Sequence, residues 1–190
     1  ADLRDAILCG ADLRYTDLHG ADLRYTDLRN AILCGADLHG ATLRDADLRD
    51  ANLCDANLSF ATLSGATLRR ANLRRANLRD ADLRDAILCG ADLRYTDLSN
   101  ATLRDANLRR ANLNWRSHAL ISEILWQAAT TTDQEMLAVF IGRKTNWCWD
   151  QWLAFDHPER EWALDELAKW VKPSDGAPEE LTSRAQTLLG

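Results

Sequence analysis

Residues 1–15 read ADLRD-AILCG-ADLRY, and the same five-residue pattern continues without interruption to Trp115. Leucine stands at the third position of all 23 units, from Leu3 to Leu113. Alanine stands two residues before each leucine, with three exceptions, Thr16, Thr26 and Thr96. Because a repeat of this regularity constrains the whole backbone, the period of five decides the fold of this part of the chain.

A period of five fits neither a helix nor a continuous strand. On an α-helix, residues five apart are rotated by about 140°, so the leucines would spiral around the axis without forming an apolar face. On a strand, residues five apart point to opposite faces, whereas alanine and leucine of one unit, two apart, point to the same face. If the chain bends after each leucine, the pattern predicts a solenoid with alanine and leucine inside and coils about 4.8 Å apart.

Tandem A-(D/N)-L-x-x units resemble those of the pentapeptide-repeat proteins over residues 1–115. The resemblance implies a mainly β fold, namely a right-handed quadrilateral β-helix (a β-solenoid) of about six coils with four units in each. Alanine, leucine and arginine favour helices, but a helix without an apolar face has nothing to pack against, so we expect the β-helix. Direct support for a 20-residue coil is thin, because Ala6–Gly10 recurs 25 residues later at Ala31–Gly35.

The period ends at Trp115, and all seven tryptophans lie from that residue onward. Helical spacing predicts a Trp-rich helical module over residues 116–172, followed by a linker and a weak terminal helix over 173–190. Thr132 and Glu135 fit a capping box, and Asp156 with Pro158 fits the start of another helix. The expected helices span residues 117–129, 132–142, 147–154, 156–171 and 179–189.

The helical module has several compatible uses. It caps the end of the solenoid, where the last coil would otherwise expose unpaired backbone groups, it joins two chains in a homodimer, or it binds a partner. Capping meets a physical need, and the other two uses are compatible with it. The side chains that would build its core or its interface are Trp126, Trp147, Trp149, Trp152, Trp162 and Trp170.

Charge is nearly balanced along the array. Through Trp115 there are 16 arginines and 17 aspartates, without lysine or glutamate, whereas the whole chain has a net charge of −6. We therefore do not expect nucleic acid as a partner. An acidic protein is the more suitable ligand for the densest positive patch, which comprises Arg69, Arg70, Arg74, Arg75, Arg79, Arg109 and Arg110.

If residues 20 apart stack, one face combines carboxylates with imidazoles, at Asp17, His19, Asp37, His39 and Asp97. These groups bind metals, but an open flat surface offers neither a closed coordination shell nor supporting second-shell contacts, so we expect no metal site. Cys34 and Cys54 would stack with Cα atoms near the disulfide range. In a reducing compartment we expect free thiols.

Signatures of catalysis are missing from the sequence. It contains no Gly-rich phosphate loop, nucleophile elbow or Cys-x-x-Cys pair, so we expect no catalytic residues, no cofactor and no enzyme activity. No apolar run approaches the roughly 18 residues of a membrane span, and no signal peptide precedes the array. A cytoplasmic location without membrane contact is the expectation.

The sequence favours a non-catalytic scaffold that presents flat β-helix faces to an unidentified protein. The alternative comes from the resemblance, because some bacterial pentapeptide-repeat proteins mimic DNA, bind DNA gyrase, protect it from quinolones and dimerise through carboxy-terminal helices. That role needs an acidic surface, and the arginines of this near-neutral array would repel a basic DNA-binding surface. A third interpretation is an inert spacer or an assembly module.

Overall fold

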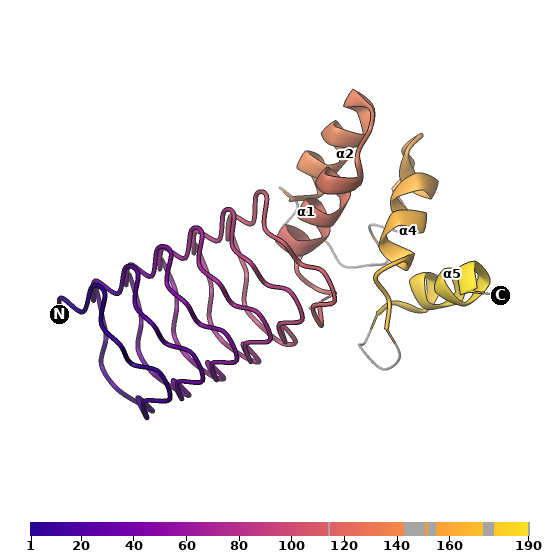
Figure 1. The fold of residues 1–190 in the computed structure, drawn as a ribbon. Helices are drawn as coiled ribbons and strands as arrows, with labels where there is room; N and C mark the ends of the chain where they lie inside the picture. The colour runs from indigo at the N-terminus through magenta and orange to yellow at the C-terminus, as the bar shows by residue number, and fades with distance from the viewer. Residues whose placement is uncertain (114, 143–150, 152–154, 173–176, 190) are drawn as a thin grey trace. The chain divides into compact units, whose positions relative to one another are not determined.

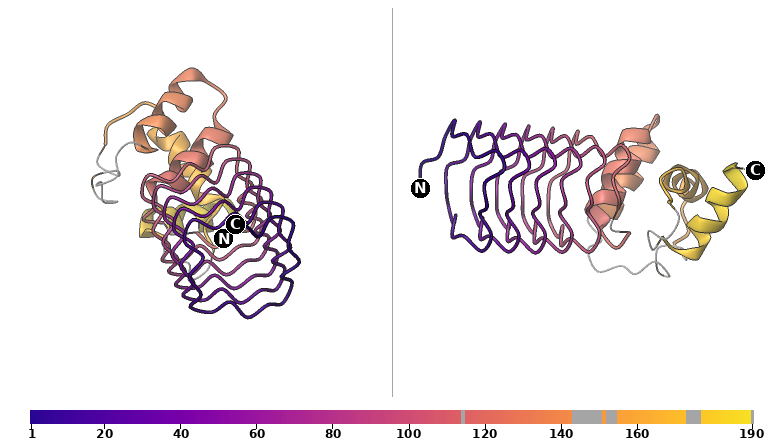
Figure 2. Two further views of the ribbon diagram at one scale, coloured as in Figure 1. Left: turned by 90° about the vertical axis from the view of Figure 1, so that its left-hand side faces the viewer. Right: turned by 60° about the horizontal axis from the view of Figure 1, so that its bottom comes forward.

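The computed structural model describes residues 1–113, 115–142, 151, 155–172 and 177–189. The chain divides into two compact units, Ala1–Leu113 and Asn114–Gly190 (Figure 1). In the first unit, parallel β-bridges join residues 20 apart, from Asp2 and Asp22 to Asp92 and Asn112. Four five-residue units therefore complete each coil, and Figure 2 shows the coils stacked along a common axis.

Each unit turns the chain at its fourth and fifth residues. The leucine carbonyl accepts a hydrogen bond from the amide three residues later, as from Ala6 N to Leu3 O at 3.1 Å. The fifth residue has a positive φ in every unit from Asp5 (58°) to Arg110 (60°). Turns with a positive φ at their third residue favour glycine, yet most of these positions hold another residue. The contacts between coils must offset the cost of the left-handed conformation there.

Backbone hydrogen bonds between coils fix the 20-residue register. Leu23 N donates to Thr42 O at 2.7 Å, Thr42 N donates to Ala21 O at 2.9 Å, and the same pattern recurs along the array. Side-chain amides add a further ladder, because Asn72 Nδ2 donates to Asn52 Oδ1 at 2.9 Å. These contacts, rather than the repeat alone, decide which units share a face.

Alanine and leucine fill the interior, as the period of five predicts. From Ala21 to Leu93, no alanine or leucine at these positions is more than 1% exposed. Buried threonine replaces alanine where its hydroxyl finds an acceptor, since Thr26 Oγ1 donates to Leu23 O at 2.6 Å. In the first coil Leu3, Leu8 and Leu13 are only half-buried, because no coil stacks against one side of them, whereas Leu18 is 9% exposed.

The second unit contains α1 (His118–Ala128), α2 (Thr132–Gly142), α4 (Arg160–Ala168) and α5 (Glu179–Leu189). Helix α1 packs against α2 and α4, and α4 packs against α5. Aliphatic side chains form the contacts, and Leu125, Ile141 and Leu164 are all 0% exposed. The predictions for α1, α2 and α5 are confirmed to within one residue at each end. Among the described residues, no helix has both the length and the apolar composition needed to cross a bilayer.

The prediction for α4 is wrong at both ends, because the expected helix over 156–171 spans only Arg160–Ala168. Glu159 is the N-cap residue and its side chain makes no capping bond, while its backbone N–H donates to His157 Nδ1 at 3.1 Å. A residue that precedes proline avoids the helical conformation, so the segment before Pro158 stays outside the helix. The expected helix over 147–154, apart from residue 151, lies outside the described residues, and so do residues 173–176 of the expected linker over 172–178.

The side-chain cap of α2 lies one residue earlier than the capping box predicted at Thr132 and Glu135, and its return bond comes from the residue before the N-cap. Thr131 Oγ1 accepts a hydrogen bond from Gln134 N at 3.3 Å, and Gln134 Oε1 accepts one from Thr130 N at 2.9 Å. Thr131 and Gln134 have the same three-residue spacing as Thr132 and Glu135, so both pairs satisfy the sequence rule. The structure selects the first pair.

Candidate interaction surface

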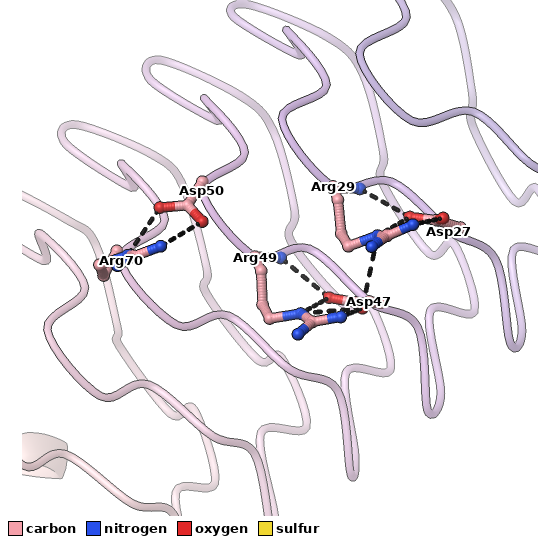
Figure 3. Close-up of polar contacts among 6 residues, drawn as sticks. All are labelled: Asp27, Arg29, Asp47, Arg49, Asp50 and Arg70. Atoms are coloured by element: carbon pink, nitrogen blue, oxygen red, sulfur yellow. Dashed lines mark hydrogen bonds and ion pairs between the residues drawn. The ribbon is translucent and has the colours of Figure 1, made fainter.

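In units that read Asp-Leu-Arg, the two charged side chains bind each other. Arg29 Nε and Nη2 donate to the two carboxylate oxygens of Asp27 at 2.8 and 2.5 Å, and Arg49 binds Asp47 in the same way (Figure 3). Both side chains point outward from one short extended segment, because they are two residues apart. The same bidentate pair occurs at Asp2–Arg4, Asp12–Arg14, Asp22–Arg24, Asp82–Arg84 and Asp92–Arg94.

These pairs lower the charge that the array presents to a partner. The hydrogen bonds from Arg29 lower the pKa of Asp27 to about 2, and those from Arg4 have the same effect on Asp2. Exposed ion pairs contribute only about 0–1 kcal/mol each to stability. Their main consequence is that most arginines on the array are already bound to a carboxylate.

We expect Arg29→Gln to return the pKa of Asp27 from about 2 toward the ordinary aspartate value of about 3.9. A carboxyl whose pKa is lowered in the native state stabilises the fold above its unfolded-state pKa, and this contribution is lost as the pH falls through the native value. The substitution therefore removes part of the acid-dependent loss of stability between about pH 4 and pH 2. Carboxyl ¹³C shifts of Asp27 measured over this pH range test the change.

The matched control for that titration is Arg14→Gln, which removes the partner of Asp12 on a different face and should leave Asp27 unchanged. If Asp27 titrates identically with and without Arg29, the pair does not set its pKa.

Six arginines stand where threonine or asparagine replaces the aspartate two residues earlier: Arg44, Arg69, Arg74, Arg79, Arg104 and Arg109. Arg44, Arg79 and Arg104 instead contact the aspartate that follows them, at 3.5, 3.3 and 3.6 Å. Arg69, Arg74 and Arg109 are each followed by another arginine, and none of the three makes an ion pair with a described residue. Their guanidinium groups are therefore available to a ligand.

The structure brings together only part of the predicted arginine patch. Arg69–Arg70 and Arg74–Arg75 lie at two successive turns of one coil, and Arg79 lies on the next face. Arg70 donates two hydrogen bonds of 2.7 Å to Asp50 in the preceding coil (Figure 3), and Arg75 pairs with Asp55 at 2.9 Å. Arg109–Arg110 lie two coils beyond Arg69–Arg70 in the 20-residue register, with Cys89–Gly90 between them.

Tyr95 is a functional candidate that sequence reasoning missed. It lies one coil beyond Arg75 in the 20-residue register, is 70% exposed, and lines a shallow hollow together with Arg74 and Arg75. Along the chain, no aromatic residue lies between the arginines of residues 69–79. The signal that finds Tyr95 is the 20-residue register, which the hydrogen bonds establish.

The predicted acidic and histidine face is present, but its polar groups bind one another and the backbone. The rings of His19 and His39 stack with centroids 5.0 Å apart, and His39 Nδ1 lies 2.8 Å from Ser59 Oγ. Asp17 and Asp37 each accept a hydrogen bond from the backbone N–H of the histidine two residues later, at 3.0 Å. Asp97 binds Ser99 instead. In the described part of the chain, no group of three or more His, Cys, Asp or Glu side chains is suited to hold a metal.

The family model for pentapeptide repeats, in eight copies, matches residues 1–30, 22–59, 51–88 and 86–115, which is more than half of the chain. The chain belongs to the pentapeptide-repeat family. Its array is accordingly a right-handed β-helix, with the four-unit coils that the β-bridges show.

Solved pentapeptide-repeat proteins are similar to this array. Rfr23 from the cyanobacterium Cyanothece 51142 is 37% identical, over 47% of this chain and 62% of Rfr23, with a TM-score of 0.47. A pentapeptide-repeat protein of the Arabidopsis thaliana thylakoid lumen is 30% identical, over 61% of this chain and 77% of its own, with a TM-score of 0.45.

QnrB1, a plasmid-mediated fluoroquinolone resistance protein, is 16% identical over 60% of this chain and 72% of its own, with a TM-score of 0.45. At that identity the likeness concerns the fold alone. The present pentapeptide-repeat protein spans less than two thirds of Rfr23. It has no match among the curated proteins.

The helical unit of this pentapeptide-repeat protein places three of the predicted tryptophans beside its core. Trp126 of α1, Trp162 of α4 and Trp170 just beyond α4 are half-buried, whereas the fully buried positions are aliphatic. These three tryptophans thus line the margin of the core, whereas Trp115, which is 3% exposed, is buried. The others of that prediction, Trp147, Trp149 and Trp152, lie outside the described residues.

Proposed function

We propose that this pentapeptide-repeat protein is a non-catalytic binding scaffold whose contact surface is the arginine corner, defined as Arg69, Arg70, Arg74, Arg75 and Tyr95. The observation that carries this proposal is the interruption of charge pairing at Arg69 and Arg74. Elsewhere on the array, an aspartate two residues earlier or one residue later neutralises most arginines. At this corner two guanidinium groups have no such partner among the described residues.

An acidic protein surface is the ligand that this corner fits. Guanidinium groups bind carboxylates in a bidentate geometry, and Tyr95 places an exposed aromatic side chain beside them. Arg70 and Arg75 form ion pairs with Asp50 and Asp55, which fix the position of their side chains beside Arg69 and Arg74. Because the backbone ladder holds the corner in place, binding would order few additional groups.

The DNA-mimic alternative has weaker support from this surface. Such a mimic needs unneutralised carboxylates, whereas the aspartates of the Asp-Leu-Arg units are bound by arginine. A spacer role does not account for the interrupted pairing at Arg69 and Arg74. For the helical unit, capping of the solenoid and dimerisation remain proposals from its sequence.

Partner capture by the immobilised full chain tests the proposal. We expect Arg69→Gln with Arg74→Gln to reduce capture of specific partners at least about tenfold, the effect of losing about 1.4 kcal/mol of binding free energy. The matched control is Arg44→Gln with Arg104→Gln, which removes two exposed arginines from the same position of the five-residue unit. It causes the same change in net charge and should retain the partners.

Quantitative mass spectrometry of the captured proteins provides the readout. Equal capture by both double variants, or capture that depends on Arg44 and Arg104 instead, would assign binding to another surface. Circular dichroism verifies that the variants keep the fold, as expected for exposed side chains.

A further inference from the structure

We propose that Cys34 and Cys54 form a two-coordinate site for a soft monovalent cation, Cu(I) or Ag(I). The sequence alone predicts free thiols at these positions. The inference concerns thiol chemistry and not charge recognition, although Arg74 of the arginine corner lies one coil beyond Cys54.

The register places the two thiols at equivalent points of successive coils. A parallel bridge joins Ile32 to Asn52, two residues before each cysteine. Gly35 N donates to Cys54 O at 2.9 Å, which fixes the turn that follows Cys34 onto the turn that contains Cys54. Side chains in such a column repeat at the coil spacing of about 4.8 Å. Both cysteines are half-buried, so a small ion has access to them.

Distances favour a bridging ion over a disulfide. A bond between a metal and a thiolate is about 2.3 Å long, so an ion midway between two thiolates separates the sulfur atoms by about 4.6 Å, close to the coil spacing. The Cβ atoms of a disulfide are about 3.5–4.5 Å apart, so the two coils would have to approach by about 0.3–1.3 Å. Leu33 and Leu53, both 0% exposed, pack beneath the pair and resist that approach.

The ligand set selects the kind of ion. Two thiolates without a third ligand suit a soft, two-coordinate ion, and no group of three metal-binding side chains exists among the described residues to hold zinc. Burial and a hydrogen bond with Cys34 raise the pKa of Cys54 to about 11, so the Cys54 thiol is protonated at neutral pH when no metal is bound. Binding forms two metal–sulfur bonds, releases two protons to solvent and leaves a complex of charge −1.

Neighbouring charges favour that anionic complex. Arg14 lies one coil before Cys34 and Arg74 lies one coil after Cys54, and each arginine interacts electrostatically with the thiol next to it. Because thiol protons are released on binding, the affinity should rise with pH.

Anaerobic competition between the protein and bicinchoninate for Cu(I) tests the site. The reference is the full chain with Cys9, Cys89 and Cys148 replaced by serine, which keeps only the proposed pair. We expect it to bind one Cu(I), and we expect a further Cys34→Ser or Cys54→Ser to weaken binding by more than the about 10–100-fold typical of an outer-shell change. In a spacing control, Cys34→Ser with Arg14→Cys leaves thiols at residues 14 and 54, two coils apart, and should bind no better than either single variant.

Several outcomes would overturn the proposal. These are the absence of Cu(I) binding by the reference, undiminished binding by either single variant, and tight binding by the spacing control. A reference protein that instead loses two hydrogen atoms in mass and binds no Cu(I) would show that the thiols form a disulfide. Because Cys34 and Cys54 lie on the outer surface, serine at either position should leave the fold intact, which circular dichroism verifies.

Discussion

Leu58→Ala should destabilise the array by about 3–5 kcal/mol, near the upper end for a buried leucine. Leu58 is 0% exposed and lies between Leu38 and Leu78 of the adjoining coils, which are equally buried. The cavity left by the substitution has little means of closing, because interlocked backbone hydrogen bonds on both sides hold the coil spacing. The cost should therefore include most of the cavity term as well as the lost burial.

Denaturant unfolding followed by circular dichroism measures this loss. Leu3→Ala is the matched control, because Leu3 occupies the same unit position but is only half-buried in the first coil. It should cost roughly half as much or less, since less apolar area is removed from water in the native state. An equal decrease in the free energy of unfolding at the two positions would mean that a second adjoining coil does not increase the stabilisation that a leucine provides.

Ala46→Leu should destabilise the array by about 3 kcal/mol, because the interior has no space for three further carbon atoms. Ala46 is 1% exposed and lies between Thr26 and Ala66 in the stacking register. Expansion of the coil to admit leucine would stretch the hydrogen bond of 2.9 Å from Thr67 N to Ala46 O. Unfolding by denaturant again measures the change.

Ala46→Thr is the control for that substitution. Thr26 and Thr96 show that a threonine fits this position when its hydroxyl donates to the preceding leucine carbonyl, at 2.6 and 2.7 Å. We expect a cost of less than about 1 kcal/mol, because the added hydroxyl is satisfied. If threonine and leucine destabilise equally, the hydrogen bond seen at Thr26 and Thr96 does not offset the volume that threonine adds at this position.

The sequence predicts the interior of the array because only one arrangement of a five-residue period buries alanine and leucine together. It does not predict the register. Ala6–Gly10 and Ala31–Gly35 have identical sequences 25 residues apart and lie on different faces, because hydrogen bonds join residues 20 apart. The register is a property of the closed coil, and a linear repeat of five is compatible with several coil lengths.

The same limit explains what was missed on the surface. Arg69 and Arg70 are neighbours in sequence, yet only Arg70 is neutralised, because its partner Asp50 lies one coil earlier. Arg109 belongs to the predicted patch, and the 20-residue register leaves one coil between it and Arg69. In the helical unit, Thr131 and Thr132 both begin acceptable capping boxes, and sequence rules offer no basis for a choice.

The left-handed turn residues have a consequence for how such a surface diversifies. Tyr15, Asp50 and Arg70 adopt φ values of 56°, 58° and 57°, so backbone shape at these corners does not depend on residue type. Substitutions at these positions can therefore change the charge and polarity of a face while the backbone conformation stays the same. The side chain at the same position of the adjoining coil limits which residues fit at a corner. A Cβ atom on Gly35, for example, would lie 2.6 Å from the ring of Tyr15. New surfaces on this frame should therefore evolve, or be designed, as whole columns of residues 20 apart.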